Sequence, residues 1–317
     1  MRAEPPADQT PPDGGKLLII TGRPGRMANR LFLFAHIVGF AEEHHYRVMN
    51  PTFHSYAALF ENTRSDIYCQ YPAASRTNLL DSLPGVSRII KGTRMFYHAG
   101  RLARTLQEKF RLFGRSAAVL QETPRGEVTL LEGPKVRSCI DPAKIILVNG
   151  WKLRAPECLQ KHADKIRRHF QPIPEIEYDV HLLMQRVRQN ADVVIGVHIR
   201  HTDYRRWKGG KYFFPISRYA EWMRELIPQF PGAKVSFLVC SDEPRTEQEF
   251  PGLPVVLSVN TPVGDLCALS KCDYVFGPLS TYSQWASFYG NVPLFHVHDS
   301  NHRMDRAQFR VSWLEDY

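Results

Sequence analysis

Short apolar runs alternate along the chain with segments whose apolar residues recur at helical spacing. The runs have the length and composition of strands buried in a parallel sheet, and they are Leu17–Thr21, Ile145–Asn149, Val193–Arg200, Val235–Cys240, Asp273–Gly277 and Pro293–His298. Helical spacing is found in Asn29–His45, Pro156–Phe170, Ile176–Asn190 and Ile216–Phe230. Strands that alternate with helices predict βαβ units, and therefore an α/β protein with parallel sheets.

The predicted strands are too many for one small sheet, and 317 residues correspond to about two domains at roughly 150 residues each. Two prolines in residues 171–174 interrupt the pattern, so we expect a hinge within residues 171–190. The expected organisation is a disordered tail over residues 1–15, one domain over residues 16–180 and a second over residues 181–317. The tail is rich in proline and has no apolar run, which excludes a signal peptide there.

Composition indicates a folded protein with an excess of basic residues. Hydrophobic residues make up 43% and charged residues 23%, and no run reaches the roughly 18 apolar residues of a membrane span. The net charge is +9, from 41 basic and 32 acidic residues. The excess lies in two segments, Asp81–Arg125 and Arg200–Arg218. Nucleic acid, an anionic membrane surface and a phosphorylated small substrate are the partners that such patches favour, and solvated surface is the alternative.

The six cysteines are scattered, without a CxxC pair or the Cys/His spacing of a zinc site. Cys240, Cys267 and Cys272 lie in apolar stretches, where we expect reduced thiols of the core. A cytoplasmic protein is therefore expected.

Chemistry-bearing residues stand at the end of the predicted strand Val193–Arg200. His198 and Arg200 are two positions apart, so they share one side of an extended segment. A guanidinium at the mouth of a parallel sheet is suited to hold a phosphate through two parallel hydrogen bonds. The alternative is a structural salt bridge between Arg200 and Asp203.

Two loops elsewhere also have the form of anion sites. Residues 22–29 form a glycine-containing turn before a helix, without the ending of a P-loop. Residues 280–283, Ser-Thr-Tyr-Ser, offer hydroxyls and backbone N–H groups at a helix start. An ordinary turn and a plain N-cap are the respective alternatives. Asp265, at another helix start, is either a cap or an acceptor for the N–H donors of guanine.

Six blocks, in order, resemble segments of the bacterial α-1,2-fucosyltransferases, which belong to a superfamily with an HxR element. They are residues 25–42, Asn149–Trp151, His198–Tyr204 (compare HVRRGDY), Phe237–Glu243 (compare FxVFSDD), Asp265–Cys272 and Ser280–Trp285. His201 and Thr202 stand where that family has Arg and Gly, and the nucleotide half matches better than the acceptor half.

The resemblance implies a GT-B fold, in which two Rossmann-like domains face each other across a nucleotide-sugar cleft. Residues 16–180 would form the acceptor domain and residues 181–317 the GDP-sugar domain. The implied reaction is an inverting transfer of fucose from GDP-fucose to a glycan hydroxyl, with an α-1,2 linkage and without a metal or other cofactor. The implied acceptor is a glycan or glycolipid, with no nucleic-acid partner. The basic segment Asp81–Arg125 matches nothing in that family, and we expect it to face either an anionic acceptor or an inner-membrane surface that carries lipid-linked glycans.

Residue roles follow from the same resemblance. Arg200, His198 and Asp203 are the expected catalytic residues, with Arg200 neutralising the departing phosphate. The expected donor-binding residues are Asn29, Arg30, His198, Arg200, Ser241, Asp242, Asp265, Ser280, Thr281, Tyr282 and Ser283. His201, Asp203 and Glu243 are open alternatives for the base. Two other functions stay open, a nucleotide-dependent transferase such as a sulfotransferase and a basic non-enzymatic module that binds nucleic acid or membrane.

Overall fold

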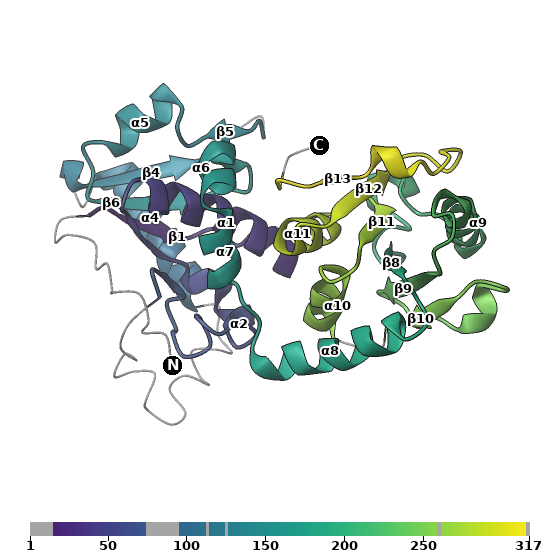
Figure 1. The fold of residues 1–317 in the computed structure, drawn as a ribbon. Helices are drawn as coiled ribbons and strands as arrows, with labels where there is room; N and C mark the ends of the chain where they lie inside the picture. Colours follow the sequence, from purple (N-terminus) through teal and green to yellow (C-terminus); the bar gives the residue numbers. More distant parts are fainter. Residues whose placement is uncertain (1–14, 74–94, 112–113, 124–125, 259–260, 315–317) are drawn as a thin grey trace, which may run out of the picture. The chain divides into compact units, whose positions relative to one another are not determined.

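The computed structural model describes residues 15–73, 95–111, 114–123, 126–258 and 261–314. The contacts divide the chain into two compact units, with the boundary between Gln171 and Pro172 (Figure 1). The boundary expected at residues 180 and 181 falls inside helix α8 (Pro174–Arg188), which belongs to the second unit. Of the tail expected over residues 1–15, only Gly15 lies within the described residues.

The first unit is built on a five-stranded sheet in the order β3-β2-β1-β6-β4. The strands are parallel except for β3, which runs antiparallel to β2, and β5 and β7 form a separate parallel pair. The strands are β1 (Leu17–Ile20), β2 (Arg47–Met49), β3 (Gln70–Tyr71), β4 (Ala117–Gln121), β5 (Thr129–Leu130), β6 (Ile145–Asn149) and β7 (Leu153–Arg154). The helices are α1 (Met27–Glu43), α2 (His54–Ala57), α4 (Met95–Phe110), α5 (Pro134–Ile140), α6 (Pro156–Lys161) and α7 (Ala163–His169).

The second unit is built on a six-stranded sheet in the order β10-β9-β8-β11-β12-β13, parallel except for β13. The strands are β8 (Val193–Ile199), β9 (Val235–Ser241), β10 (Val255–Leu257), β11 (Tyr274–Pro278), β12 (Pro293–Val297) and β13 (Arg310–Val311). Besides α8, the helices are α9 (Ile216–Leu226), α10 (Pro262–Leu269) and α11 (Thr281–Gly290). Helix α9 lies on one face of this sheet, and α8, α10 and α11 lie on the other (Figure 1).

The side chains of β8 divide the second unit into these two layers. Ile195, Val197 and Ile199 point into the core that the sheet forms with α9, where Trp222 is fully buried. The residues between them face α10 and α11, as the period of two in a strand requires. His198 therefore lies on the α11 side, together with the end of β11.

Gly277 of β11 allows the two central strands to approach closely where both end. A Cβ atom at this position would lie 2.5 Å from the carbonyl oxygen of His198 and 2.9 Å from its Cβ. Because the first of these atoms is backbone, no side-chain rotation can relieve the clash. The close approach fixes His198 against the loop that follows β11.

The strands predicted from the apolar runs are confirmed, with bounds that differ by at most one residue at either end. The helix predicted over Pro156–Phe170 is instead two helices, α6 and α7, with His162 between them. The helix predicted over Ile216–Phe230 ends at Leu226, and Pro228 lies in the 3-10 turn that follows. Proline has no N–H for the helical ladder, which accounts for this early end.

All six cysteines are free thiols, and Cys240, Cys267 and Cys272 are buried as expected. Among the described residues, no helix combines the length and apolar character that a membrane span requires.

Replacing Gly277 with Ala tests the close approach of β8 and β11. We expect the Gly277→Ala variant to lose about 1–3 kcal/mol of unfolding free energy, the usual effect of forcing extra volume into a packed core. Urea unfolding followed by circular dichroism measures the change, with Ser217→Ala on an exposed part of α9 as the control. An alanine variant as stable as the parent would show that β11 moves away from His198 without cost.

Candidate functional site

The carboxyl ends of β8 and β11 mark the point where the strand order of the second sheet reverses. From β8 the chain continues to β9 and β10 on one side, and then places β11 and β12 on the other side of β8. Open α/β sheets bind ligands at such a point, because the loops beyond the two strands diverge there. His198 and Arg200 stand at the end of β8 and residues 280–283 follow β11, so the topology brings these two predicted groups together.

His198 is almost fully buried and neutral. Its ring lies 4.9 Å from that of Tyr282, centroid to centroid, at an angle of 31°. Burial, reinforced by the positive charge of Arg200, lowers the pKa of His198 to about 3. The Nδ1 atom is buried and has no hydrogen-bond partner among the described residues. Buried polar atoms are normally paired, so this nitrogen marks a place where a ligand group or water is expected.

Arg200 is held by Asp203 in a bidentate pair. The Nε and Nη2 atoms donate to the two carboxylate oxygens at 2.9 and 2.8 Å. The guanidinium also lies 4.9 Å from the ring centre of Tyr204. The salt bridge between Arg200 and Asp203, one of the two alternatives from the sequence, is therefore present. In this structure the Asp203 carboxylate orients the Arg200 guanidinium.

Tyr204 connects the ends of the two central strands. Its hydroxyl donates a 2.5 Å hydrogen bond to the carbonyl oxygen of Leu279, the residue before the helix cap Ser280. The Tyr204 side chain is buried. This hydroxyl thus ties the segment after β8 to the start of α11.

The Ser-Thr-Tyr-Ser segment forms the start of α11, and part of it serves the fold. Ser280 is the N-cap, and its Oγ accepts a 3.2 Å hydrogen bond from the N–H of Tyr282. Ser283 Oγ lies 2.9 Å from Nε2 of His296, and Ser283 is fully buried. Thr281 stays partly exposed in the first turn. The first turn carries the positive end of the helix dipole and faces the strand ends, the arrangement that binds anions.

Asp265 lies in the first turn of α10 and has an unusual environment. The cap of that helix is the side chain of Thr261, so Asp265 is not the N-cap. Its carboxylate is hydrogen-bonded to Ser258 and is mostly buried. Burial raises the pKa of Asp265 to about 6, against the lowering effect of Ser258. Tyr282 donates its hydroxyl to Pro262 O in the same turn, at 2.5 Å, so α10 and α11 meet beside Asp265.

Ser241 and Asp242, predicted to bind the donor, hold neighbouring loops in this structure. Asp242 accepts a 2.8 Å hydrogen bond from the N–H of His201 and a longer one, 3.3 Å, from that of Thr202. Ser241 Oγ accepts from Arg245 Nε at 3.2 Å. Asp242 thereby fixes the segment that carries Arg200, and Ser241 holds the loop that follows β9.

Two of the three open alternatives for the base are also engaged. His201 is buried, with Nε2 2.8 Å from the carbonyl oxygen of Phe214 and Nδ1 3.3 Å from Arg245. Glu243 is paired with Arg205 and Arg245, and its hydrogen bond to Arg205 is the main cause that lowers its pKa. Like Asp203, both side chains are thus held by other residues of the second unit.

Asn29 and Arg30 lie in the first unit, where Arg30 holds the glycine turn together. Its Nη1 donates to Thr52 O at 3.1 Å and to Ser55 Oγ at 2.9 Å, and the side chain is buried. Gly25 has a left-handed φ of 42°, and Asn29 lies so close that a Cβ there would meet its Nδ2 at 2.2 Å. The turn is therefore a packed strand–helix connection, while Nε of Arg30 is buried without a hydrogen-bond partner among the described residues.

The basic segment Asp81–Arg125 lies partly outside the described residues. Within it, Arg104 turns toward Thr21 Oγ1 at 3.4 Å, whereas Arg101, Lys109 and Arg111 are exposed.

Sequence reasoning missed His296 and Ser258 as members of the site. His296 lies near the end of β12 and supports Ser283, and burial with two neighbouring histidines lowers its pKa to about 3. The available signal was its place at the carboxyl end of a buried strand. Among the described residues, no group of three or more His, Cys, Asp or Glu side chains is arranged to hold a metal ion.

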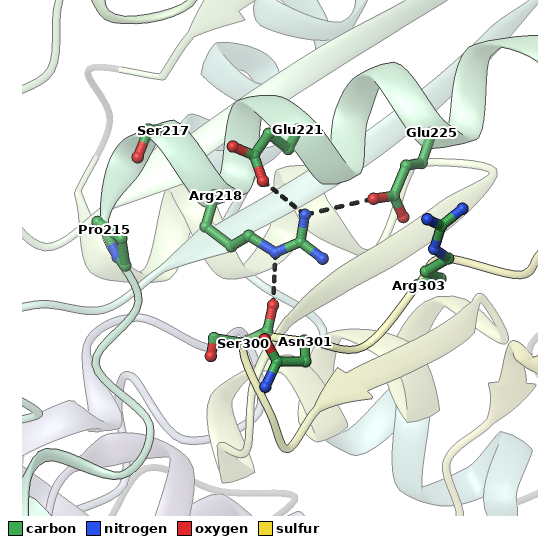
Figure 2. Close-up of a pocket in the computed structure, with 8 residues that line it drawn as sticks. All are labelled: Pro215, Ser217, Arg218, Glu221, Glu225, Ser300, Asn301 and Arg303. Atoms are coloured by element: carbon green, nitrogen blue, oxygen red, sulfur yellow. Dashed lines mark hydrogen bonds and ion pairs between the residues drawn. The ribbon is translucent and has the colours of Figure 1, made fainter.

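A pocket of about 500 Å³ lies elsewhere in the second unit, beside α9. Figure 2 shows Arg218 at its centre, bonded to Glu221, Glu225 and the carbonyl of Ser300. These polar groups satisfy one another and join α9 to the segment after β12. The pocket contains none of the predicted site residues.

No family model and no curated protein sequence matches the chain. Solved structures do match. A mutant of Arabidopsis thaliana FUT1 in complex with GDP has a TM-score of 0.55 and 11% identity, over 94% of this chain and 74% of that one. Fucosyltransferase NodZ from Bradyrhizobium has a TM-score of 0.51 and 16% identity, over 91% and 97% of the two chains.

NodZ α-1,6-fucosyltransferase co-crystallised with GDP gives a TM-score of 0.50 at 16% identity, over 89% and 94%. At these identities the likeness concerns the fold. The chain therefore has the two-unit, Rossmann-like α/β fold, of the GT-B type, that it was expected to have.

Proposed function

We propose that this protein is a glycosyltransferase that transfers fucose from GDP-fucose to a hydroxyl of a glycan. The observation that carries the proposal is the group at the switch point of the second sheet: a cationic Arg200, a neutral His198 with an unpaired Nδ1, and the first turn of α11. Support comes also from a fold like that of solved fucosyltransferases described in complex with GDP. The sequence blocks favour an α-1,2 linkage and an inverting reaction.

Breaking the bond between fucose and the β-phosphate leaves negative charge on GDP. In the proposed mechanism Arg200 and the positive end of α11 stabilise that charge, as fixed donors and dipoles do in other transferases. The proposal thus involves no metal ion and no cofactor beyond the donor. Asp265 is proposed to accept the N–H donors of guanine, and Tyr282 to hold α10 and α11 in register beside it.

Asp203 receives a different role from the one its sequence position indicated. With both oxygens on Arg200, it is proposed as the positioning partner of that guanidinium. When a diphosphate competes for the same donors, the carboxylate is released beside the reacting sugar. In that state it becomes available to take the acceptor proton, a step to which a general base typically contributes about 10²–10⁴-fold.

We further propose that α4 contacts an anionic membrane surface, where a glycolipid acceptor would be found. On this helix Leu102 is 59% exposed and Phe110 is 71% exposed, and the basic residues Arg101, Lys109 and Arg111 are exposed beside them. Exposed apolar and basic side chains on one helix are typical of binding in the plane of a lipid interface.

Substitution of Arg200 tests the donor site. We expect GDP to raise the melting temperature of the parent protein in the presence of EDTA, and Arg200→Ala to weaken GDP at least about tenfold. The reason is the loss of charge-assisted hydrogen bonds worth about 1.5–3 kcal/mol each. Arg206→Ala, a neighbouring exposed arginine, is the control. Stabilisation by adenosine 3′,5′-bisphosphate but not by GDP would favour the sulfotransferase alternative and reject the proposal.

The raised pKa of Asp265 predicts how GDP binding depends on pH. Because that carboxyl titrates near pH 6, the acceptor form is lost as the pH falls from 7 to 5, and GDP affinity should fall with it. The phosphate of GDP titrates equally for every variant, so the ratio of affinities of parent and Asp265→Asn isolates this residue. Calorimetric titration at several pH values measures the ratio, with Asp179→Asn on the exposed side of α8 as the control. An affinity ratio that stays constant over this pH range would show that Asp265 does not bind guanine.

Vesicle binding tests the membrane proposal. We expect the protein to co-sediment with vesicles containing phosphatidylglycerol and not with phosphatidylcholine alone. The variants Arg101→Glu/Lys109→Glu and Leu102→Ser/Phe110→Ser should each reduce binding several-fold, through lost charge attraction and lost apolar burial respectively. Lys135→Glu/Lys144→Glu has the same net charge as the first variant and changes exposed lysines of the same unit. Equal losses of vesicle binding in both charge variants would show that α4 is ordinary solvent-exposed surface.

A further inference from the structure

The basic segment Arg200–Arg218 separates in the structure into paired and unpaired cations. Arg200, Arg205 and Arg218 have carboxylate partners. The other three cations, Arg206, Lys208 and Lys211, have no carboxylate within ion-pair distance among the described residues, and all three are exposed. The unpaired half of this charge therefore lies within residues 206–211.

Aromatic rings surround the two lysines. Trp207 and Tyr212 lie 5.3 Å apart, centroid to centroid. The Lys208 ammonium is 4.9 Å from the Trp207 ring centre, and that of Lys211 is 5.4 Å from the Tyr212 ring centre. Tyr212 is buried, whereas Trp207 is 37% exposed. We call Trp207, Lys208, Lys211 and Tyr212 the Trp207 cluster.

The backbone of this cluster is held in a rarely adopted conformation. Lys208, Gly209 and Gly210 have successive positive φ values of 48°, 68° and 81°. A left-handed lysine is unfavourable, because its Cβ crowds the following carbonyl. Such residues persist where surrounding contacts over-determine them, most often at functional sites. Here the contacts are those of the lysine with the two rings.

The Trp207 cluster is joined to the proposed donor site through one aromatic ring. Trp207 stacks on Tyr204 at 4.8 Å and 29°, and Tyr204 in turn carries the Arg200 guanidinium at 4.9 Å. Trp207 thus lies within about 10 Å of Arg200. On the other side, Tyr212 lies 6.2 Å from His298, just after β12. The cluster therefore lies at the same carboxyl edge of the sheet as the proposed donor site, with the Tyr204 ring between Trp207 and Arg200.

We infer that the Trp207 cluster is an acceptor subsite for an anionic glycan, one that carries a carboxylate, sulfate or phosphate near the hydroxyl that receives the sugar. The exposed part of the Trp207 side chain offers apolar contact to a sugar, and the two lysines supply the countercharge. The position next to Arg200 is where an acceptor would meet a donor sugar. The inference rests on the proposed function for its assignment to a fucose acceptor, but the anion subsite is testable by itself.

Two oligosaccharides that differ only in charge provide the probe. Tetragalacturonic acid and its fully methyl-esterified form are titrated into the protein with GDP present, and binding is followed in the ligand NMR spectra. We expect the acid to bind at least about tenfold more tightly than the ester, a difference of about 1.4 kcal/mol. The Lys208→Gln/Lys211→Gln variant should bind both forms equally. Arg224→Gln/Lys234→Gln removes two other exposed charges of the second unit and should behave as the parent.

Several outcomes would overturn the inference. Equal affinity for acid and ester in the parent, or acid binding unchanged in the double lysine variant, would show that the cluster holds no anionic sugar. Weaker GDP stabilisation in that variant with unchanged acid binding would assign the lysines to the donor diphosphate. Tighter, steeply salt-dependent binding of oligothymidylate than of the acid would favour a nucleic-acid surface instead.

The test also separates the subsite from the proposed function. If GDP does not raise the melting temperature of the parent protein, the fucosyltransferase proposal is rejected. Charge-selective binding that disappears with the two lysines would still establish the subsite, and only its assignment to a fucose acceptor would be lost. If GDP does stabilise the protein and the charge selectivity is absent, the enzyme proposal stands and the anionic acceptor is rejected.

Discussion

The contact between Gly277 and the backbone of His198 is the constraint on which the candidate site depends. It brings the end of β11 directly against the end of β8, so that α11 begins beside the segment that carries Arg200. The same contact buries His198 beneath Tyr282 and removes the imidazole from water. Burial in turn keeps this histidine uncharged next to a permanently charged guanidinium. Without the close approach, the loops that follow these two paired strands would stand further apart.

Charge in the second unit is arranged by pairing, and this changes what the net charge of +9 means. Arginines that hold loops are neutralised locally: Arg205 by Glu243, Arg245 by Glu243 and Glu249, and Arg218 by glutamates of its own helix. These ion pairs hold loops in place, and the exposed pairs add little to the free energy of unfolding. The positive potential left for a partner comes from the few cations without such a neighbour. A count of basic residues along the sequence cannot make that distinction, because the partner of Arg205 is 38 residues away.

The sequence was sufficient to predict the fold class, β1 and β6 of the first sheet, and β8, β9, β11 and β12 of the second, because buried parallel strands are continuous apolar runs bounded by turns. It was insufficient for the short strands β2 and β10, for the edge strand β4, and for α4, whose apolar stripe is diluted by basic residues. At the site, the strand ends identified His198, Arg200 and the start of α11. The sequence could not show which polar side chains face a ligand and which hold the fold together. Ser283 contacts His296, and Asp242 accepts hydrogen bonds from residues 201–202, and both contacts join residues that are distant in the sequence.

The pair between Arg200 and Asp203 connects the proposed donor chemistry to the proposed acceptor chemistry. An arginine fork satisfied by a carboxylate in the empty site is already oriented, so little side-chain entropy is lost when a diphosphate replaces that carboxylate. The diphosphate adds negative charge beside the neutral His198, and Arg200 together with the positive end of α11 offsets that charge. Asp203 gives up its two hydrogen bonds to Arg200 only when a donor is present. On the proposed function, the carboxylate therefore takes the proton of an acceptor hydroxyl only when there is a sugar to receive, and it stays on Arg200 when no donor is bound.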